Sequence, residues 1–179
     1  MSGNKTKTHR AIVDTVLFAM LGALMFALKV VFEPLPNIHP VTMLIMVYTI
    51  VFGWKALFPT YVFVVLLGAF YGFGIWWIPY LYVWAVYVAL TLLLPKNMPR
   101  KIAAFVYPAV CALFGLMYGI LYAPGQALLF GYTFRQMLAW IAAGFPYDAL
   151  HALGNLAMGL LVLPLSVLSG KLYSKMIGS

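Results

Sequence analysis

The stretch KTKTHRAIVDTVLFAMLGALMFALKVVFEP, residues 5–34, carries the pattern that decides the fold. Basic residues come first, and an apolar run of about 20 residues follows, which is the length a helix needs to cross a bilayer. Glu33 and Pro34 end the run, since proline disfavours a helical residue before it. No small-residue cleavage site follows a short apolar core, so we expect no cleavable signal peptide here. We predict a cytosolic basic tail over residues 1–10 and a membrane helix over residues 11–32.

Composition places the rest of the chain in a membrane as well. Of its 179 residues, 65% are hydrophobic and only 8% are charged, and the mean hydropathy is +1.01. Soluble domains carry about 25% charged residues, so water is a poor solvent for this much apolar side chain. The single cysteine, Cys111, excludes a disulfide framework. We therefore predict an all-α integral membrane protein with a single domain over residues 1–179.

Five further apolar runs are long enough, or nearly long enough, to span the membrane. We expect them at residues 41–53, 56–71, 78–94, 101–121 and 147–173, which makes a bundle of six transmembrane helices. Pro164 is expected to kink the last of them. Between the fifth and sixth spans we expect a long outer segment, and the sequence leaves open whether its part 134–143 is a helix.

The basic residues predict the orientation of the bundle. With six spans, nine of the 11 lysines and arginines fall on one side, and only Lys29 and Arg135 fall on the other. Cytoplasmic loops carry the excess of positive charge, so both termini are predicted to be cytoplasmic. Because these charges sit between apolar runs, the net charge of +8 does not indicate a nucleic-acid partner. The outer loops, residues 33–40, 71–80 and 123–136, are rich in proline, glycine and aromatic residues, so we expect the function there.

The sixth span begins with an unusual polar stripe. Asp148, His151 and Asn155 stand at helical spacing on one face, and Asp148 is one of only three acidic residues in the chain. A charge in a membrane helix normally faces a partner or a watery cavity. Asp148 alone is equally well explained as a helix cap, and packing between helices would satisfy the other two. We interpret the three together as the wall of a polar cavity.

Two other patterns have a structural and a functional explanation each. The first is an aromatic group: Trp76, Trp77, Tyr80, Tyr82, Trp84 and Tyr87. An interfacial belt explains Trp76 and Trp77, while the inward stripe of Tyr80, Trp84 and Tyr87 fits either helix packing or a ligand-stacking wall. The second is a strip of small residues every four positions, which lets another helix approach closely: Ala19, Ala23 and Ala27. That other helix belongs either to this chain or to a partner protein in the membrane.

Signatures of catalysis are missing from the sequence. It contains no metalloprotease, nucleophile-elbow or phosphate-loop motif. His39 and His151 both lie toward the outer side, but two histidines and one internal acid do not make a convincing metal site. We predict that the chain is not an enzyme and has no resident cofactor. An acid–base pair of Asp148 and His151 in an intramembrane enzyme is the competing hypothesis.

The whole pattern resembles the S component of an energy-coupling factor (ECF) vitamin transporter. The resemblance rests on six spans with both termini inside, the strip in AMLGALMFA, residues 19–27, and the segments VFGWKALFPTYVFVVL, 51–66, and AGFPYDALHALGN, 143–155. It implies a multi-pass protein of a bacterial plasma membrane that binds a vitamin in an outer pocket. The alanine strip would dock on a membrane T subunit, and two cytosolic ATPase subunits would consume the ATP.

The resemblance also implies which residues line the pocket. They would be Asn37, His39, Trp76, Trp77, Tyr80, Trp84, Gln126, Arg135, Tyr147, Asp148, His151 and Asn155. Among S components the chain is most similar to the cobalamin-specific type. Pantothenate, pyridoxine, a queuosine precursor and folate stay open, although folate would want more basic groups on the outside. The remaining alternative is a structural subunit of a membrane complex without a small ligand.

Overall fold

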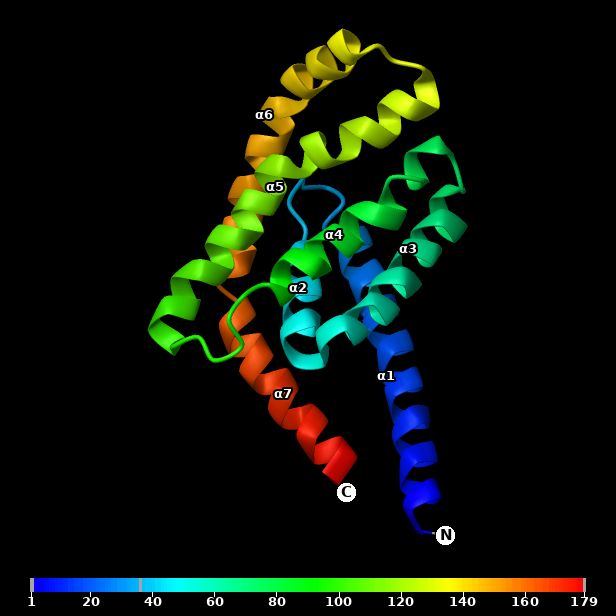
Figure 1. The fold of residues 1–179 in the computed structure, drawn as a ribbon, viewed down its shortest axis with the longest axis vertical. Coiled ribbons are helices and arrows are strands. Elements are labelled where there is room, and N and C mark those ends of the chain that lie inside the picture. Colours follow the sequence, from blue (N-terminus) through cyan, green and yellow to red (C-terminus); the bar gives the residue numbers. More distant parts are fainter. Residues whose placement is uncertain (1, 36, 179) are drawn as a thin grey trace.

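The computed structural model describes residues 2–35 and 37–178, and most of that chain is helical (Figure 1). The α-helices are α1 Ser2–Val31, α2 Val41–Phe52, α3 Leu57–Tyr71, α4 Tyr80–Leu92, α5 Arg100–Phe130, α6 Phe134–Gly159 and α7 Val162–Gly178. Two short 3₁₀ helices precede α3 and α4, namely η1 Gly53–Ala56 and η2 Ile75–Trp77. In lipid, an open chain can satisfy its backbone only as helix, which explains why the apolar runs take this form.

Several of these helices have the length and composition of membrane spans. Four stretches qualify, namely His9–Val31, Val41–Tyr71, Ile75–Leu92 and Arg100–Phe130, and the bent pair α6–α7 makes a fifth. The predicted count of six requires α2 and α3 to cross separately. At about 1.5 Å per residue the 12 residues of α2 extend for about 18 Å, well short of a bilayer core. The all-helical class is confirmed, and the long apolar helices are compatible with a membrane bundle. The count of six stays a prediction.

The core is built around α2. Residues 41–49 of this helix are all buried, because α2 packs against α1, α4, α6 and α7. At its end Gly53 adopts a φ of +63°, a conformation that glycine takes without strain, and the chain turns sharply into α3 (Figure 1). α3 then packs along α1, where Gly22 lies directly against Val62 and the carbonyl of Pro59.

The segment expected as a long outer loop is helical. α5 continues to Phe130 and α6 begins at Phe134, so only residues 131–133 connect them. The predicted boundaries at residues 121 and 147 were wrong because Pro124 and Pro146 lie inside helices. Each proline removes one backbone hydrogen bond and bends the helix without ending it. α5 changes direction in its second half, and α5 and α6 form a hairpin at the end of the molecule away from the termini (Figure 1).

The start of α6 carries its own signal. The hydroxyl of Thr133 accepts a hydrogen bond from the N–H of Gln136, and the Gln136 side chain accepts one from the N–H of Thr133. This reciprocal capping box satisfies two of the amides that a helix start leaves free. It settles the open question of residues 134–143, which belong to a regular helix.

Two more boundaries differ from expectation. α1 begins at Ser2, so residues 2–10 continue the first helix and do not form a separate tail. The predicted helix 147–173 is broken between α6 and α7, which meet at 51°. The kink expected at Pro164 is confirmed by this bend: Pro164 has no N–H for the carbonyl of Leu160, the first residue of the break.

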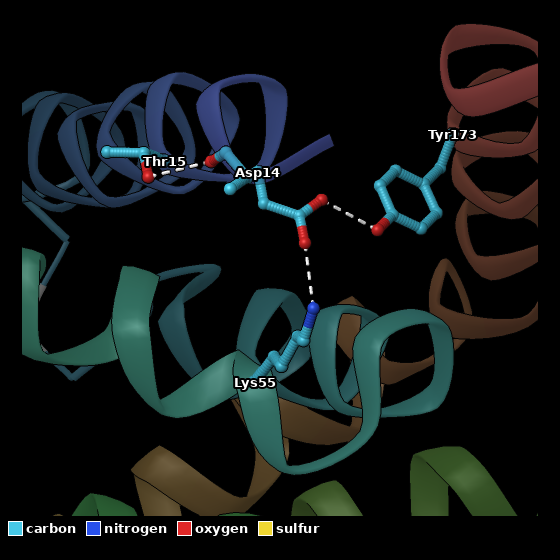
Figure 2. A network of polar contacts seen from close by, with 5 residues as sticks. Asp14, Thr15, Lys55 and Tyr173 are labelled. Atoms are coloured by element: carbon cyan, nitrogen blue, oxygen red, sulfur yellow. Dashed lines mark hydrogen bonds and ion pairs between the residues drawn. The ribbon is translucent and has the colours of Figure 1, made fainter. Parts of the chain in front are cut away.

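Both termini lie at one end of the molecule (Figure 1). Near that end the carboxylate of Asp14 joins three elements (Figure 2). Lys55 in η1 donates to its Oδ2 at 2.8 Å, and the hydroxyl of Tyr173 in α7 donates to its Oδ1 at 2.7 Å. The clustering of Lys55 with both terminal helices agrees with the predicted allocation of basic residues to one side. That this side is cytoplasmic stays a prediction.

Candidate functional site

A cavity of about 500 Å³ lies among the elements away from the termini. Its walls come from the end of α1, the loop that follows it, α3, η2, α4, α5 and α6. The deepest lining residues are Phe63, Trp84 and His151, which are 1%, 2% and 4% exposed. Tyr147, 67% exposed, lies at the rim. Drug-sized ligands occupy cavities of about 300–1,000 Å³, so the volume suits a small molecule.

The structure brings most of the predicted site residues to this one cavity. They come from the α1–α2 loop, from η2 and α4, and from α6, and they are Asn37, His39, Trp76, Tyr80, Trp84, Tyr147, Asp148 and His151. Tyr147 also makes a contact across the rim: its carbonyl accepts a hydrogen bond of 3.4 Å from the Asn37 side chain. The loop and α6 are therefore tied together beside the cavity.

Four predicted residues lie elsewhere. Trp77 donates from Nε1 to the carbonyl of Val64 at 2.7 Å, which anchors η2 on α3. Arg135 is exposed in the first turn of α6, and Gln126 is half-buried in the second half of α5. Asn155 is 1% exposed and lies where α6 packs closely on Gly115 of α5. The polar stripe of α6 is thus divided between cavity wall and helix packing.

The sequence analysis missed about half of the lining. The additional residues are Lys29, Glu33, Leu35, Phe63, Tyr118, Gly119, Tyr122, Trp140 and Gly144. A signal for part of this set is present in FGLMYGILY, residues 114–122, where Gly115 and Gly119 are spaced for a close helix approach and Tyr118 and Tyr122 share a face. The α5–α6 contact that this glycine pair permits is the most extensive between any two elements of the described chain.

Aromatic rings form a continuous row along the cavity. Trp140 stacks on Tyr122 with centroids 6.0 Å apart and planes at 14°, and Tyr122 stacks on Tyr118 at 5.9 Å and 27°. Tyr80 meets Tyr122 edge-on at 89°, and it meets Trp84 at 67°. Stacked and edge-to-face pairs are the preferred geometries of aromatic rings, so these side chains hold one another in place. All five residues line the cavity, so a ligand there meets rings that are already held in place.

Asp148 contributes the carboxylate of the cavity. It is 9% exposed, and its Oδ2 accepts a hydrogen bond of 3.1 Å from the N–H of Gly119. Gly119 has to be glycine for this contact, because a Cβ at that position would collide with the same carboxylate. The contact holds α6 close to α5 and fixes where the negative charge points.

Two histidines meet in the deep part of the cavity. The rings of His39 and His151 have centroids 5.1 Å apart, and His151 is also 5.2 Å from the ring of Tyr118. Burial, His151 and Lys29 lower the pKa of His39 to about 3, so this loop histidine is neutral at physiological pH. His39 Nδ1, His151 Nε2 and Trp84 Nε1 are buried without a hydrogen-bond partner in the described part of the chain. Such orphaned polar atoms cost free energy, which a ligand with matching groups would recover.

The polar groups of the cavity are few. Within residues 2–35 and 37–178, no group of three or more histidine, cysteine or acidic side chains is placed to hold a metal ion. No hydrogen bond joins Asp148 to His151 in the same part of the chain, as a preformed acid–base pair would require. The arrangement is instead an aromatic cavity with a few fixed polar groups, which is the usual form of a small-molecule site.

The alanine strip lies on a different surface. Ala19, Ala23 and Ala27 are all exposed on α1, and Gly22 makes the close contact with α3 in their place. Packing inside this chain therefore does not explain the strip. Large apolar neighbours on the same helix, among them Val16, 53% exposed, and Met20, 65% exposed, continue the uncovered face.

Comparison with known proteins yields no relative: no family model, no curated protein sequence and no solved structure matches the chain.

Proposed function

We propose that the chain is the substrate-binding S component of an ECF-type importer and binds a vitamin-like small molecule in the aromatic cavity. One observation carries the proposal: residues from seven separate segments converge on a cavity of about 500 Å³. A purely structural subunit has no need for a preformed cavity with orphaned polar atoms at its floor.

The alanine strip supports the second half of the proposal. A strip of small, exposed side chains on a membrane helix allows the backbone of another helix to approach closely. The strip is on α1, outside the cavity, so a partner T subunit can dock there while the ligand is bound. ATP would be hydrolysed by two cytosolic partner subunits. Delivery of ligand would then depend on the assembled complex and not on turnover by this chain.

The volume of the cavity bears on the choice of vitamin. A volume of about 500 Å³ suits a ligand of drug size. We therefore place pyridoxine, pantothenate and a queuosine precursor ahead of cobalamin, whose corrin ring system would extend past the rim at Tyr147. Folate is the least favoured candidate because a single lysine, Lys29, is the only permanently basic side chain that lines the described cavity.

Native mass spectrometry of the detergent-purified chain, expressed in a vitamin-rich culture, tests the proposal. A copurified mass that matches one of these vitamins, and that is displaced by adding the same vitamin in excess, supports it. Titration of the purified chain with each vitamin at micromolar concentration covers a ligand lost in purification. A chain that retains no small molecule and binds none of the vitamins would overturn the proposal in favour of a structural subunit.

A further inference from the structure

Asp148 is a buried carboxylate without a positive partner. The one ion pair within the described residues joins Lys55 to Asp14 at the other end of the molecule. Asp148 receives only the hydrogen bond from Gly119, although it is 9% exposed and lies in an apolar helix. A buried charge of this kind is costly unless a counter-charge or water compensates it. Asp148 lines the cavity, which can hold such a compensating group.

The other charged and titratable groups around the cavity do not supply that counter-charge. Lys29 lines the cavity one helical turn before Glu33, whose carboxylate already accepts a hydrogen bond from Tyr71. The two opposite charges there leave no net charge at that end of α1. His39 is neutral, and His151 makes no hydrogen bond or ion pair with Asp148 in the described structure. Tyrosine hydroxyls add no positive charge, so the net field of the cavity is negative.

The aromatic row points to the same ligand chemistry. The rings of Tyr118, Tyr122 and Trp140 are nearly parallel, and Tyr118 is adjacent in sequence to Gly119, where the carboxylate is held. The faces of tryptophan and tyrosine attract cations, most strongly where water is excluded. A planar cation placed along this row would gain ring contacts and the attraction of Asp148 together.

We infer that the cavity selects a positively charged nitrogen heterocycle, with Asp148 as its counter-ion and the Tyr118–Tyr122–Trp140 row as its stacking surface. The inference rests on the proposed function, because it assumes that the cavity binds a ligand, and it adds the ligand's charge and shape. It disfavours the anionic vitamins. A polar group of the ligand can also pair with the orphaned ring nitrogen of a histidine at the floor.

Isothermal titration calorimetry with two isosteric probes tests the inference on the full chain in detergent. 1-Methylnicotinamide is a fixed planar cation, and 3-methylbenzamide is its neutral carbon isostere. We expect the cation to bind at least about tenfold more tightly, the range of one desolvated cation–π contact with an added ionic attraction. Equal affinities, or no binding of the cation at millimolar concentration, would overturn the inference.

Two matched variants, each with one carboxylate replaced by an amide, show which carboxylate produces the preference for the cation. Asp148→Asn keeps an oxygen for the N–H of Gly119 but removes the charge, so the preference for the cation should fall to about twofold or less while 3-methylbenzamide binds as before. Asp14→Asn removes a carboxylate outside the cavity and should leave the preference unchanged. A preference that survives Asp148→Asn contradicts the role of Asp148. A neutral or anionic vitamin copurified with the chain would contradict the inference and still support the proposed function.

Discussion

The N–H of Gly119 in α5 donates a hydrogen bond of 3.1 Å to the carboxylate of Asp148 in α6, and both residues line the cavity. A methyl group at Gly119 would collide with the carboxylate, so Gly119→Ala has to separate α5 from α6 or turn Asp148 away. We expect this substitution to destabilise the chain by about 1–3 kcal/mol, the usual cost of overpacking, and to weaken ligand binding. Thermal unfolding in detergent and ligand titration measure the two effects.

Gly170→Ala is the matched control. Gly170 lies in α7, and nothing stands within 4 Å of the Cβ that alanine would add there. Alanine is the better helix former by about 1 kcal/mol, so this variant should be as stable as the original chain or more stable. If both variants unfold at the same temperature, the close approach at Gly119 does not contribute to the stability of the chain.

Much of the helical architecture could be predicted from local patterns. The helix of the apolar run in α1, the break between residues 41–53 and 56–71, and the kink near Pro164 are indicated by short stretches of sequence, and the structure has all three. The continuation of α5 through Pro124 and of α6 through Pro146 could not be predicted in this way. A proline ends a helix only when no neighbouring packing compensates for the lost hydrogen bond, and here the extensive α5–α6 contact does so.

The sequence predicted which kinds of residue form the candidate site better than it predicted which individual residues line it. Asp148 and His151 stood out because polar residues are rare in this chain, and both line the cavity. Asn155 stood out for the same reason and Trp77 stood out as part of the aromatic group, but their side chains turn toward α5 and α3. Spacing along one helix identifies a face, and only the arrangement of the neighbouring helices decides what that face meets. Tyr118 and Tyr122 were missed because tyrosines in a membrane helix are common.

The polar network around Asp14 predicts a modest loss of stability when it is broken. Asp14→Ala removes the partner of Lys55 and of Tyr173 at once. Because the Lys55 side chain is 37% exposed, water takes over part of the interaction, and we expect a loss of about 1 kcal/mol. Thermal unfolding should show a lower midpoint for Asp14→Ala. Thr15→Ala, which only removes a hydrogen bond within α1, should change the midpoint less.

Ala23→Trp tests the docking surface. The added indole would stand on an exposed strip of small residues, where it prevents the close approach of a partner helix. Copurification of the proposed T subunit and ATPase subunits should be abolished, and ligand binding by the isolated chain should stay intact. Leu172→Trp places the same bulk on α7, at a residue that is 54% exposed, and should leave assembly unaffected. Assembly that survives Ala23→Trp assigns the strip to lipid contact.

His151→Ala tests the floor of the cavity. The imidazole is 4% exposed and contacts the rings of His39 and Tyr118, so its removal opens the floor and deletes a polar partner for the ligand. We expect the affinity for the ligand to fall about tenfold or more, the value of one buried hydrogen bond with its packing. Assembly with the T subunit should be unchanged. An unaltered dissociation constant would reassign His151 to helix packing.

His39 predicts how the stability of the chain depends on pH. Its pKa is about 3 in the folded chain against about 6.5 when unfolded, so between these values the unfolded state binds a proton that the folded state does not. The free energy of unfolding is therefore highest above pH 6.5 and declines as the pH falls below it, by up to about 1.4 kcal/mol per pH unit from this group. Unfolding midpoints measured from pH 7 to pH 5 should fall for the original chain and fall less steeply for His39→Gln. The difference between the two slopes isolates His39 from every other titrating group, and parallel slopes would mean that its ring is already hydrated in the folded chain.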